Sequence, residues 1–193
     1  VLPRGPHGLD RAVVLASQRG RLLTAFVEEA AERGYNAVTI ADIVRHAGTA
    51  KRTFYQHFAD KQDCFIQAFD VTGTAIVTEI VRAGDAVDDP ILRIEVGVRA
   101  YLTAMQEMPY FARLFLTESM VAGPEIAARW MGWIELLADG LVRWRDESRV
   151  KHPEVPPLTR RQAIGVLSAL NELVRFEILR TDVAGVGEIA DEL

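Results

Sequence analysis

The sequence predicts an all-α protein made of a small helical domain followed by a larger one. Beyond the first eight residues, apolar side chains recur at three- and four-residue spacing, and no stretch sustains the two-residue alternation of a half-buried strand. Glycine and proline interrupt this pattern where helices would end. With 193 residues and 49% apolar composition, the chain can bury a substantial core. We expect an N-terminal arm over residues 1–18, a first domain over 19–66 and a second over 67–193.

The first helix is expected from about Gly20 to Arg33, after an earlier helical turn over Leu9–Ser17 that Asp10 would cap. Gly34 would end the helix, because glycine readily adopts the left-handed conformation found just after many helices. The apolar side of this helix is formed by Leu22, Leu23, Phe26, Val27 and Ala30.

Two short helices follow, joined by a tight turn. Thr39 can cap the second helix, and Asp42 lies three residues later, near the positive end of the helix dipole. Gly48 permits the turn, and a third helix is expected from about Ala50 to His57.

The third helix would bury its phenylalanines and expose its polar side chains. Phe54 and Phe58, four residues apart, would anchor it to the core. Two short helices joined at a glycine, the second exposing hydrogen-bond donors, are typical of the helix-turn-helix, whose second helix enters the DNA major groove. A solvated helix hairpin is the alternative. The side chains off the core are Lys51, Arg52, Thr53, Tyr55, Gln56 and His57.

The run "RLLTAFVEEAAERGYNAVTIADIVRHAGTAKRTFYQHFADKQDCFIQAFD", Arg21–Asp70, resembles the N-terminal DNA-binding domain of the TetR family of bacterial transcriptional regulators. The shared features are "ERGY" after the first helix, "TIADI" opening the second, "AG" at the turn, and "TFYQHF" followed by Lys61. The resemblance implies that a homodimer binds double-stranded operator DNA. The residues that the resemblance implies at the DNA interface are Thr39, Thr49, Ala50, Lys51, Arg52, Thr53, Tyr55, Gln56, His57 and Lys61.

These residue types suit the implied contacts, with one departure from the family pattern. Lys and Arg pair with guanine edges or phosphates, and Gln can pair with adenine. The family usually has a serine or similar polar residue where Ala50 stands, so we expect Thr49 to cap the third helix instead. Arg11, Arg19 and Arg21 would either reach DNA as a basic arm or remain solvated.

The charge of the chain is unevenly distributed. The net charge is -5, yet residues 1–62 carry nine Lys or Arg against six Asp or Glu. This asymmetry is consistent with an anionic partner for the N-terminal part.

Residues beyond about 61 read as further helices, over 61–83, 90–107, 109–119, 125–150 and 160–181, with a short acidic helix at the end. The family resemblance implies that this region binds a small ligand and dimerises. Its aromatic and methionine side chains suit an apolar pocket between helices, although stripes of this kind are also ordinary core. Glu118 would either orient a ligand or remain a solvated carboxylate. The expected pocket residues are Tyr101, Met105, Met108, Phe111, Phe115, Glu118, Trp130, Trp133 and Asn171.

The penultimate helix carries a seam at three- and four-residue spacing that we assign to a dimer interface, following the family resemblance. Asn171 interrupts the seam and would either fix the register of a helix pair or donate a hydrogen bond into the pocket. The apolar members of the seam are Ile164, Leu167, Val174 and Ile178.

Other classes of function find little support in the sequence. The single Cys64 is expected to pack in the core, the four histidines lack metal-ligand spacing, and "GVGEIA", Gly185–Ala190, follows no strand as a dinucleotide fingerprint would. We expect no cofactor, metal or membrane span, and we expect the protein to be cytoplasmic. We expect a repressor that binds a palindromic operator as a homodimer and is released by a hydrophobic effector. An effector-independent or architectural DNA-binding protein is the alternative, and a helical-bundle enzyme is less favoured.

Overall fold

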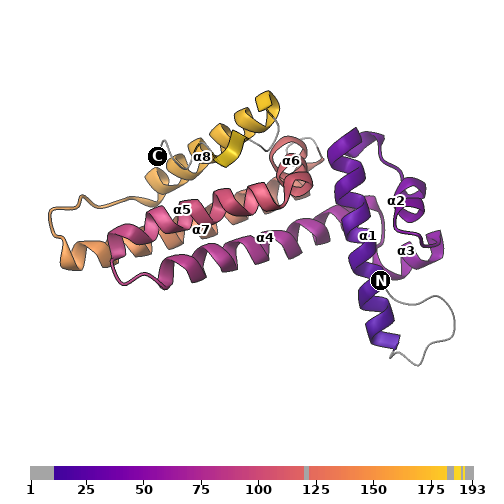
Figure 1. Cartoon of the computed structure of the whole chain (residues 1–193), viewed down its shortest axis with the longest axis horizontal. Coiled ribbons are helices and arrows are strands. Elements are labelled where there is room, and N and C mark those ends of the chain that lie inside the picture. Colours follow the sequence, from indigo (N-terminus) through magenta and orange to yellow (C-terminus); the bar gives the residue numbers. More distant parts are fainter. Residues whose placement is uncertain (1–10, 120–121, 182–184, 188, 190–193) are drawn as a thin grey trace. The chain divides into compact units, whose positions relative to one another are not determined.

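The computed structural model describes residues 11–119, 122–181, 185–187 and 189, and these residues form helices and short connections with no strand among them (Figure 1). The all-α prediction is therefore confirmed. The chain divides into two compact units, Val1–Asp70 and Val71–Leu193, whereas the boundary was predicted after residue 66.

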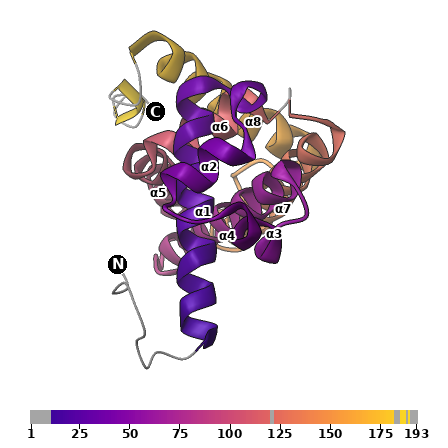
Figure 2. The same ribbon diagram turned by 90° about the vertical axis from the view of Figure 1, so that its right-hand side faces the viewer.

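The first unit contains a long helix against which two short helices pack. Helix α1 contacts both α2 and α3, and α2 contacts α3, an arrangement that faces the viewer in Figure 2. A 3-10 helix, η1, joins α1 to α2. The elements of this unit are α1 (Arg11–Arg33), η1 (Tyr35–Ala37), α2 (Ile40–His46), α3 (Lys51–His57) and the first ten residues of α4 (Lys61–Asp85).

The N-terminal helix is continuous, which corrects our prediction of a separate turn before Gly20. Helix α1 runs unbroken from Arg11 to Arg33, with Gly20 exposed inside it. Glycine inside a helix costs only about 1 kcal/mol relative to alanine, so packing of the residues that follow can hold the helix through it. The predicted cap, Asp10, lies outside the described residues.

Aromatic side chains form the core of the first unit. The ring centroids of Phe26 and Phe65 lie 5.3 Å apart, and those of Tyr35 and Phe65 also lie 5.3 Å apart. Cys64 is buried among these groups, and burial raises the pKa of its thiol, so it remains a neutral packing group as predicted.

The second unit is a helical bundle whose helices match the predicted segments. Helix α7 packs against α5 and α8, and α6 contacts both α5 and α8 (Figure 1). The predicted acidic helix at the end of the chain falls largely on residues outside the described part. The elements of the unit are the remainder of α4, α5 (Pro90–Glu107), α6 (Pro109–Glu118), α7 (Pro124–Lys151) and α8 (Arg160–Thr181).

Local sequence explains where these helices begin. Proline stands at the first turn of α5, α6 and α7, where its missing N–H costs nothing. Asp89 caps α5 by accepting from the Ile91 amide at 2.9 Å. Helix α8 begins at a reciprocal cap in which the Thr159 amide donates to Gln162 Oε1 at 2.9 Å and the Gln162 amide donates back to the Thr159 hydroxyl at 3.3 Å.

Two glycines receive the ring of Trp144 in the second unit. A Cβ atom placed on Gly84 of α4 or Gly97 of α5 would lie 2.4 or 2.9 Å from atoms of this ring. The ring is buried, and its Nε1–H donates to Asp85 Oδ1 at 2.9 Å. The missing side chains therefore allow three helices to meet around one indole.

Helix α4 is long and apolar enough to cross a membrane by length and composition alone. One such helix is weak evidence for a membrane span, because a buried helix of a soluble protein meets the same criteria.

We predict that Gly84→Ala lowers the free energy of unfolding by about 1–3 kcal/mol, because the new methyl group overlaps the Trp144 ring. Gly132→Ala is the matched control: it lies in α7, and a Cβ there meets nothing within 4 Å. That change should raise stability by about 0.4–1 kcal/mol. Urea denaturation measures both, and equal effects of the two substitutions would contradict the packing described for Trp144.

Candidate functional site

The second helix of the first unit is held by a reciprocal cap. The Asp42 amide donates to the Thr39 hydroxyl at 3.3 Å, while the Thr39 amide and hydroxyl donate to Asp42 Oδ2 at 3.0 and 2.6 Å. Arg45 donates to the other carboxylate oxygen at 2.6 Å. These bonds, Thr39 first and then Arg45, lower the pKa of Asp42 well below its usual range. The start of α2 is thus fixed as the sequence predicted, and the Thr39 hydroxyl is already engaged in the cap.

The turn between α2 and α3 needs glycine for conformational reasons. Gly48 has φ of 60°, a left-handed conformation that other residues rarely adopt. The Thr49 amide donates to the Val44 carbonyl at 2.9 Å, which closes the turn.

Helix α3 begins without a side-chain cap, which corrects our expectation for Thr49. Ala50 occupies the N-cap position and makes no side-chain hydrogen bond. The Thr49 hydroxyl is buried without a hydrogen-bond partner in the part of the chain that the structure describes. Because Thr49 precedes the cap position and its amide is used in the turn, its side chain does not bond to the first free amides of the helix.

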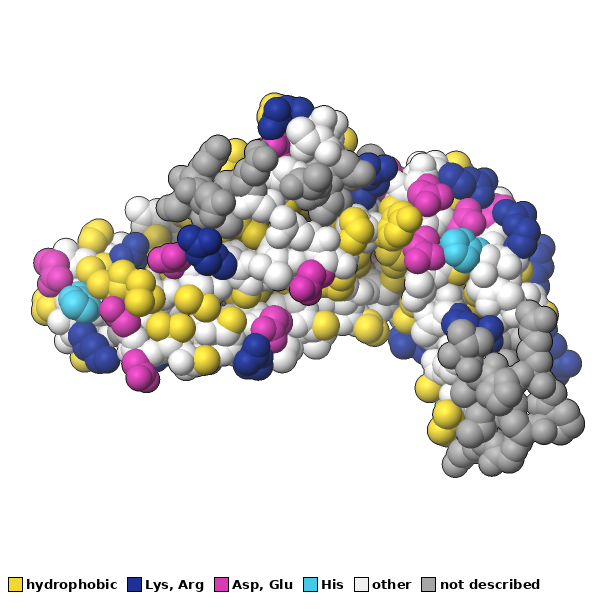
Figure 3. Space-filling model, viewed as in Figure 1, with side chains coloured by type: hydrophobic (Ala, Val, Ile, Leu, Met, Phe, Trp, Pro, Cys, Tyr) yellow, Lys and Arg dark blue, Asp and Glu magenta, His cyan; other side chains and the backbone are white. Residues whose placement is uncertain are grey.

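The two faces of α3 are chemically different. Phe54 and Phe58 are fully buried, with ring centroids 5.2 Å apart. In Figure 3, Lys and Arg side chains, together with Asp and Glu, lie on the surface of the first unit. The exposed residues of α3 are Lys51, Arg52, Tyr55 and Gln56, while Thr53 and His57 are half-buried.

The surroundings of two predicted DNA contacts, His57 and Lys61, limit what each can offer to DNA. Burial, and then the charge of Arg19, lower the pKa of His57, so its ring is neutral at pH 7. The Lys61 ammonium donates to the carbonyls of Tyr35 and Val38 at 2.7 and 2.9 Å and lies 4.2 Å from the centroid of the Tyr35 ring. Lys61 therefore fastens η1 to α4, with one N–H left for another acceptor.

The arginines assigned to a basic arm are partly engaged within the first unit. Arg19 donates to Gln67 Oε1 at 2.8 Å, and Arg21 donates to the Ala47 carbonyl at 3.3 Å. The side chain of Arg11 and residues 1–10 lie outside the described part.

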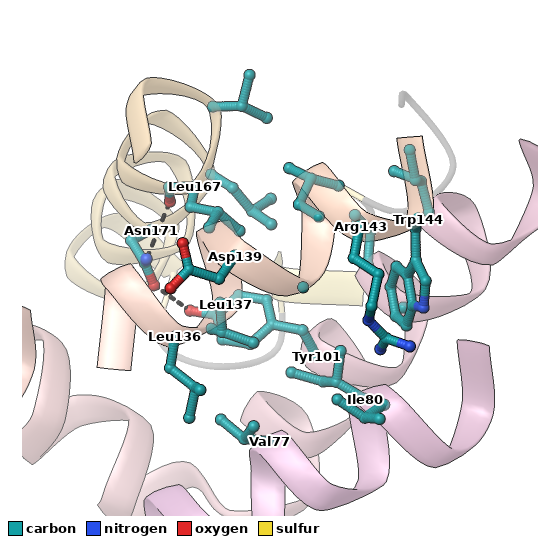
Figure 4. A pocket seen from close by; sticks show the side chains of 18 residues that line it. Val77, Ile80, Tyr101, Leu136, Leu137, Asp139, Arg143, Trp144, Leu167 and Asn171 are labelled. Atoms are coloured by element: carbon teal, nitrogen blue, oxygen red, sulfur yellow. Dashed lines mark hydrogen bonds between the residues drawn. The ribbon is translucent and has the colours of Figure 1, made fainter. Parts of the chain in front are cut away.

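The second unit contains a cavity of about 390 Å³, within the range of small-molecule sites (Figure 4). Its wall is mainly aliphatic and comes from four helices. Figure 4 shows Arg143 and Trp144 on one side of it and Leu167 and Asn171 on the other. Among its lining residues are Val77 and Ile80 of α4, Val98 and Tyr101 of α5, Leu137, Gly140 and Trp144 of α7, and Leu167 and Asn171 of α8.

A hydrogen-bonded pair lies in this otherwise apolar wall. The Tyr101 hydroxyl donates to Asn171 Oδ1 at 2.5 Å, and Asn171 Nδ2 donates to the Leu167 carbonyl at 2.9 Å. Burial raises the pKa of Tyr101, so the hydroxyl keeps its proton. Of the two roles considered for Asn171, this geometry matches a polar group at a pocket.

The remaining residues predicted for the pocket are not in the wall of this cavity, and four of them line a smaller space next to it. Tyr101 and Asn171 also border a neighbouring space of about 30 Å³, which is lined by Met105, Phe115, Trp130 and Trp133. Met108, Phe111 and Glu118 line neither space. The aliphatic residues of α4, such as Val77 and Ile80, were missed because an apolar stripe does not reveal whether a cavity or a neighbouring side chain faces it.

Helix α8 buries two of the four seam residues that were assigned to a dimer interface, Val174 and Ile178, and leaves Ile164 and Leu167 half-buried. Val174 and Ile178 are almost fully buried within the chain, and Ile164 and Leu167 are packed against the core residues Ala138, Leu141 and Ala163. A side chain buried inside one subunit has no surface left for a partner. The exposed apolar residues of α8 are instead Val166, Leu173, Phe176 and Leu179.

The described residues contain no cluster of histidine, cysteine and carboxylate side chains that could hold a metal ion.

Comparison with known proteins identifies the first unit. Residues 22–68 match the family model described as bacterial regulatory proteins, tetR family. The HTH-type transcriptional activator FasR of Mycolicibacterium smegmatis is 28% identical over 127 residues, which is 66% of this chain and 58% of that protein. A regulator of Haemophilus influenzae is 27% identical over 56% of this chain and 54% of its own length. The matched parts span only 26–58% of the curated relatives.

Solved structures share the fold of both units. The fatty acid degradation regulator FadR of Bacillus halodurans aligns with a TM-score of 0.78 at 19% identity, covering 98% of this chain and 95% of that one. FadR of Bacillus subtilis, solved in complex with stearoyl-CoA, aligns with a TM-score of 0.76 at 18% identity, covering 89% and 95%. At these identities the likeness concerns the fold alone.

We predict that Asp42→Asn lowers the melting temperature at pH 7, since the amide cannot replace the ionised cap. The pKa of Asp42 is lowered by folding, so the stabilisation is fully present above about pH 4. It is lost as the pH falls further towards the folded pKa, and the deficit should shrink between about pH 4 and 2. Thermal melts followed by circular dichroism measure this.

The control for this prediction is Asp88→Asn, an exposed aspartate in the connection before α5, which should melt like the parent protein. A deficit in Asp42→Asn that stays constant with pH would contradict the role given to the carboxylate.

Proposed function

This chain belongs to the TetR family of bacterial regulatory proteins, and from that premise we propose that it is a one-component transcriptional regulator. In this proposal a homodimer binds a palindromic DNA operator in the cytoplasm and releases it when an apolar small molecule occupies the cavity of the second unit. The observation that carries the proposal is the exposed polar face of α3, set by the burial of Phe54 and Phe58 on its other face.

DNA recognition is assigned to α3. Lys51 and Arg52 supply charge for phosphates or guanine edges, and Gln56 supplies an amide for adenine. Tyr55 is exposed and can donate to a phosphate. Lys61 would use its remaining N–H for the DNA backbone, while Thr39 would act through the amides at the start of α2 rather than through its hydroxyl.

Dimerisation is assigned to the outer face of α8. Leu173, Phe176 and Leu179 leave about half or more of their side chains exposed, and an exposed apolar face usually marks an interface. A two-fold dimer through this face would present two copies of α3, which suits half-sites about one DNA turn, roughly 34 Å, or a multiple of it apart.

The effector is assigned to the aliphatic cavity. The absence of charge from most of the wall favours a hydrophobic molecule, and the stearoyl-CoA complex of Bacillus subtilis FadR shows that this fold can hold an acyl compound. Release of DNA requires that the effector bind more tightly to the conformation that does not fit the operator. Helix α4 would carry the change, because it supplies both cavity residues and the Lys61 anchor.

The direction of regulation is repression in this proposal, and activation is the second candidate because the FasR relative is an activator. A promoter–reporter assay distinguishes them: deletion of the regulator raises expression if it represses and lowers it if it activates. The fold and family are those of regulators, and we propose no catalytic activity.

We predict that Arg52→Ala weakens binding to the operator by about tenfold or more, because an exposed cation of α3 is lost in both subunits. If Arg52 contacts phosphate, the slope of log K against log salt should fall by about 2 for the dimer. Electrophoretic mobility shifts on intergenic DNA beside the gene provide the measurement. Arg99→Ala, an exposed arginine of α5, should leave binding unchanged, and equal affinities for the two variants would refute this role of α3.

We predict that Phe176→Glu makes the protein monomeric, since a charge placed in the apolar α8 face cannot be desolvated there without a partner. Val150→Glu, which adds the same charge at an exposed residue of α7, should remain dimeric. Sedimentation velocity measures the oligomeric state of both variants. A dimeric Phe176→Glu protein would place the interface elsewhere.

A further inference from the structure

The cavity of the second unit has few polar residues in its lining. Tyr101 and Asn171 lie in its wall, while Asp139 and Arg143 on α7 are exposed and lie where solvent reaches it. The rest of the described lining is almost entirely aliphatic apart from Trp144. A ligand in this cavity therefore meets one hydrogen-bonded polar pair in the wall and a charged margin.

The pair, in which Tyr101 is buried and Asn171 half-buried, has unused capacity both to accept and to donate hydrogen bonds. The Tyr101 hydroxyl donates its hydrogen bond to Asn171 Oδ1, and its oxygen can still accept one from a ligand. Asn171 Nδ2 donates one N–H to the Leu167 carbonyl and has a second N–H to donate. A ligand group that donates to Tyr101 and accepts from Asn171 would satisfy both, and a hydroxyl or a primary amide has this dual character.

The charges near the cavity do not favour an anion. Arg143 is the only cation among the described lining residues, and it lies between two carboxylates, 3.7 Å from Asp85 and 3.8 Å from Glu147. Asp139 is itself held by Arg160, at 2.6 Å. A carboxylate brought into the cavity would lose its hydration and find no uncommitted cation, which is costly in an apolar site.

We propose that the cavity selects an uncharged amphiphile, with its apolar part among the aliphatic side chains and a single neutral donor–acceptor group at the Tyr101–Asn171 pair. This inference rests on the proposed function, because it takes the cavity to be the effector site. It names the class of effector: a long-chain or fused-ring alcohol or amide is accepted, and the corresponding acid anion is discriminated against.

The test compares 1-decanol with decanoate, which have the same chain and differ in the charge of the head group. Binding to the full chain at pH 7.5 is followed by tryptophan fluorescence, since Trp144 lines the cavity. The parent protein should bind 1-decanol at least about tenfold more tightly than decanoate. Equal binding, or tighter binding of decanoate, overturns the inference.

Because any apolar cavity disfavours an anion, a second variant isolates the pair. Tyr101→Phe combined with Asn171→Leu replaces both partners by apolar groups of similar shape, a change that folded proteins tolerate. This double variant should lose about tenfold in affinity for 1-decanol, the effect of about two hydrogen bonds, while decanoate binding stays weak and unchanged. Unchanged 1-decanol binding in a folded double variant overturns the inference.

A cavity-filling variant separates this inference from the proposed function on which it rests. Gly140 lines the cavity, and a Cβ there meets nothing within 4 Å, so Gly140→Leu should narrow the space and weaken binding of both probes. If Gly140→Leu binds 1-decanol like the parent, the probes do not use the cavity, and the effector site of the proposed function fails together with the inference. Weaker binding of both probes by Gly140→Leu, with equal binding of both by the parent, overturns the inference alone.

Discussion

The burial of Phe54 and Phe58 is the constraint on which the recognition surface depends. Helix α3 is only two turns long, so two anchors at four-residue spacing fix its rotation about its own axis. Every polar residue between and beside them must then face outwards or lie at the margin. Specific contacts also hold the neighbouring elements: Asp42 caps α2, Gly48 allows the turn, and Lys61 on α4 donates hydrogen bonds to carbonyls in and beside η1. The exposed face of α3 is therefore presented by a rigid support.

The second unit combines closely packed helices with an apolar cavity between them. Trp144 fills the slots left by Gly84 and Gly97 and so packs one region tightly. Beside it lies the aliphatic wall of the cavity, in which the buried Tyr101 donates to the half-buried Asn171 and Asn171 donates to a backbone carbonyl. Because its polar groups already have partners, this pair avoids the cost of unsatisfied groups in an apolar wall and keeps one donor and one acceptor for a ligand.

Sequence reasoning located most of the elements that local rules decide, although Thr49 does not cap α3 as expected, and it failed where packing decides the outcome. Caps, glycine turns and helical periodicity located the helices and the buried phenylalanines of α3, because each depends on residues a few positions apart. The face of α8 that stays exposed could not be found in this way, since helix periodicity identifies an apolar stripe without saying which neighbour covers it. For the same reason Phe111 and Met108 were expected at a cavity that Val77 and Ile80 in fact line. The continuity of α1 through Gly20 was likewise decided by packing rather than by local propensity.

The central claim is that the exposed face of α3 reads a DNA sequence. Incubating the full chain with random-sequence duplex DNA, recovering the bound fraction and sequencing it over several rounds tests this directly. We expect enrichment of an inverted repeat whose half-sites are one or more helical turns apart, as two copies of α3 in a two-fold dimer require. Bound DNA that remains as diverse as the starting pool, or no retained DNA at low salt, would contradict it.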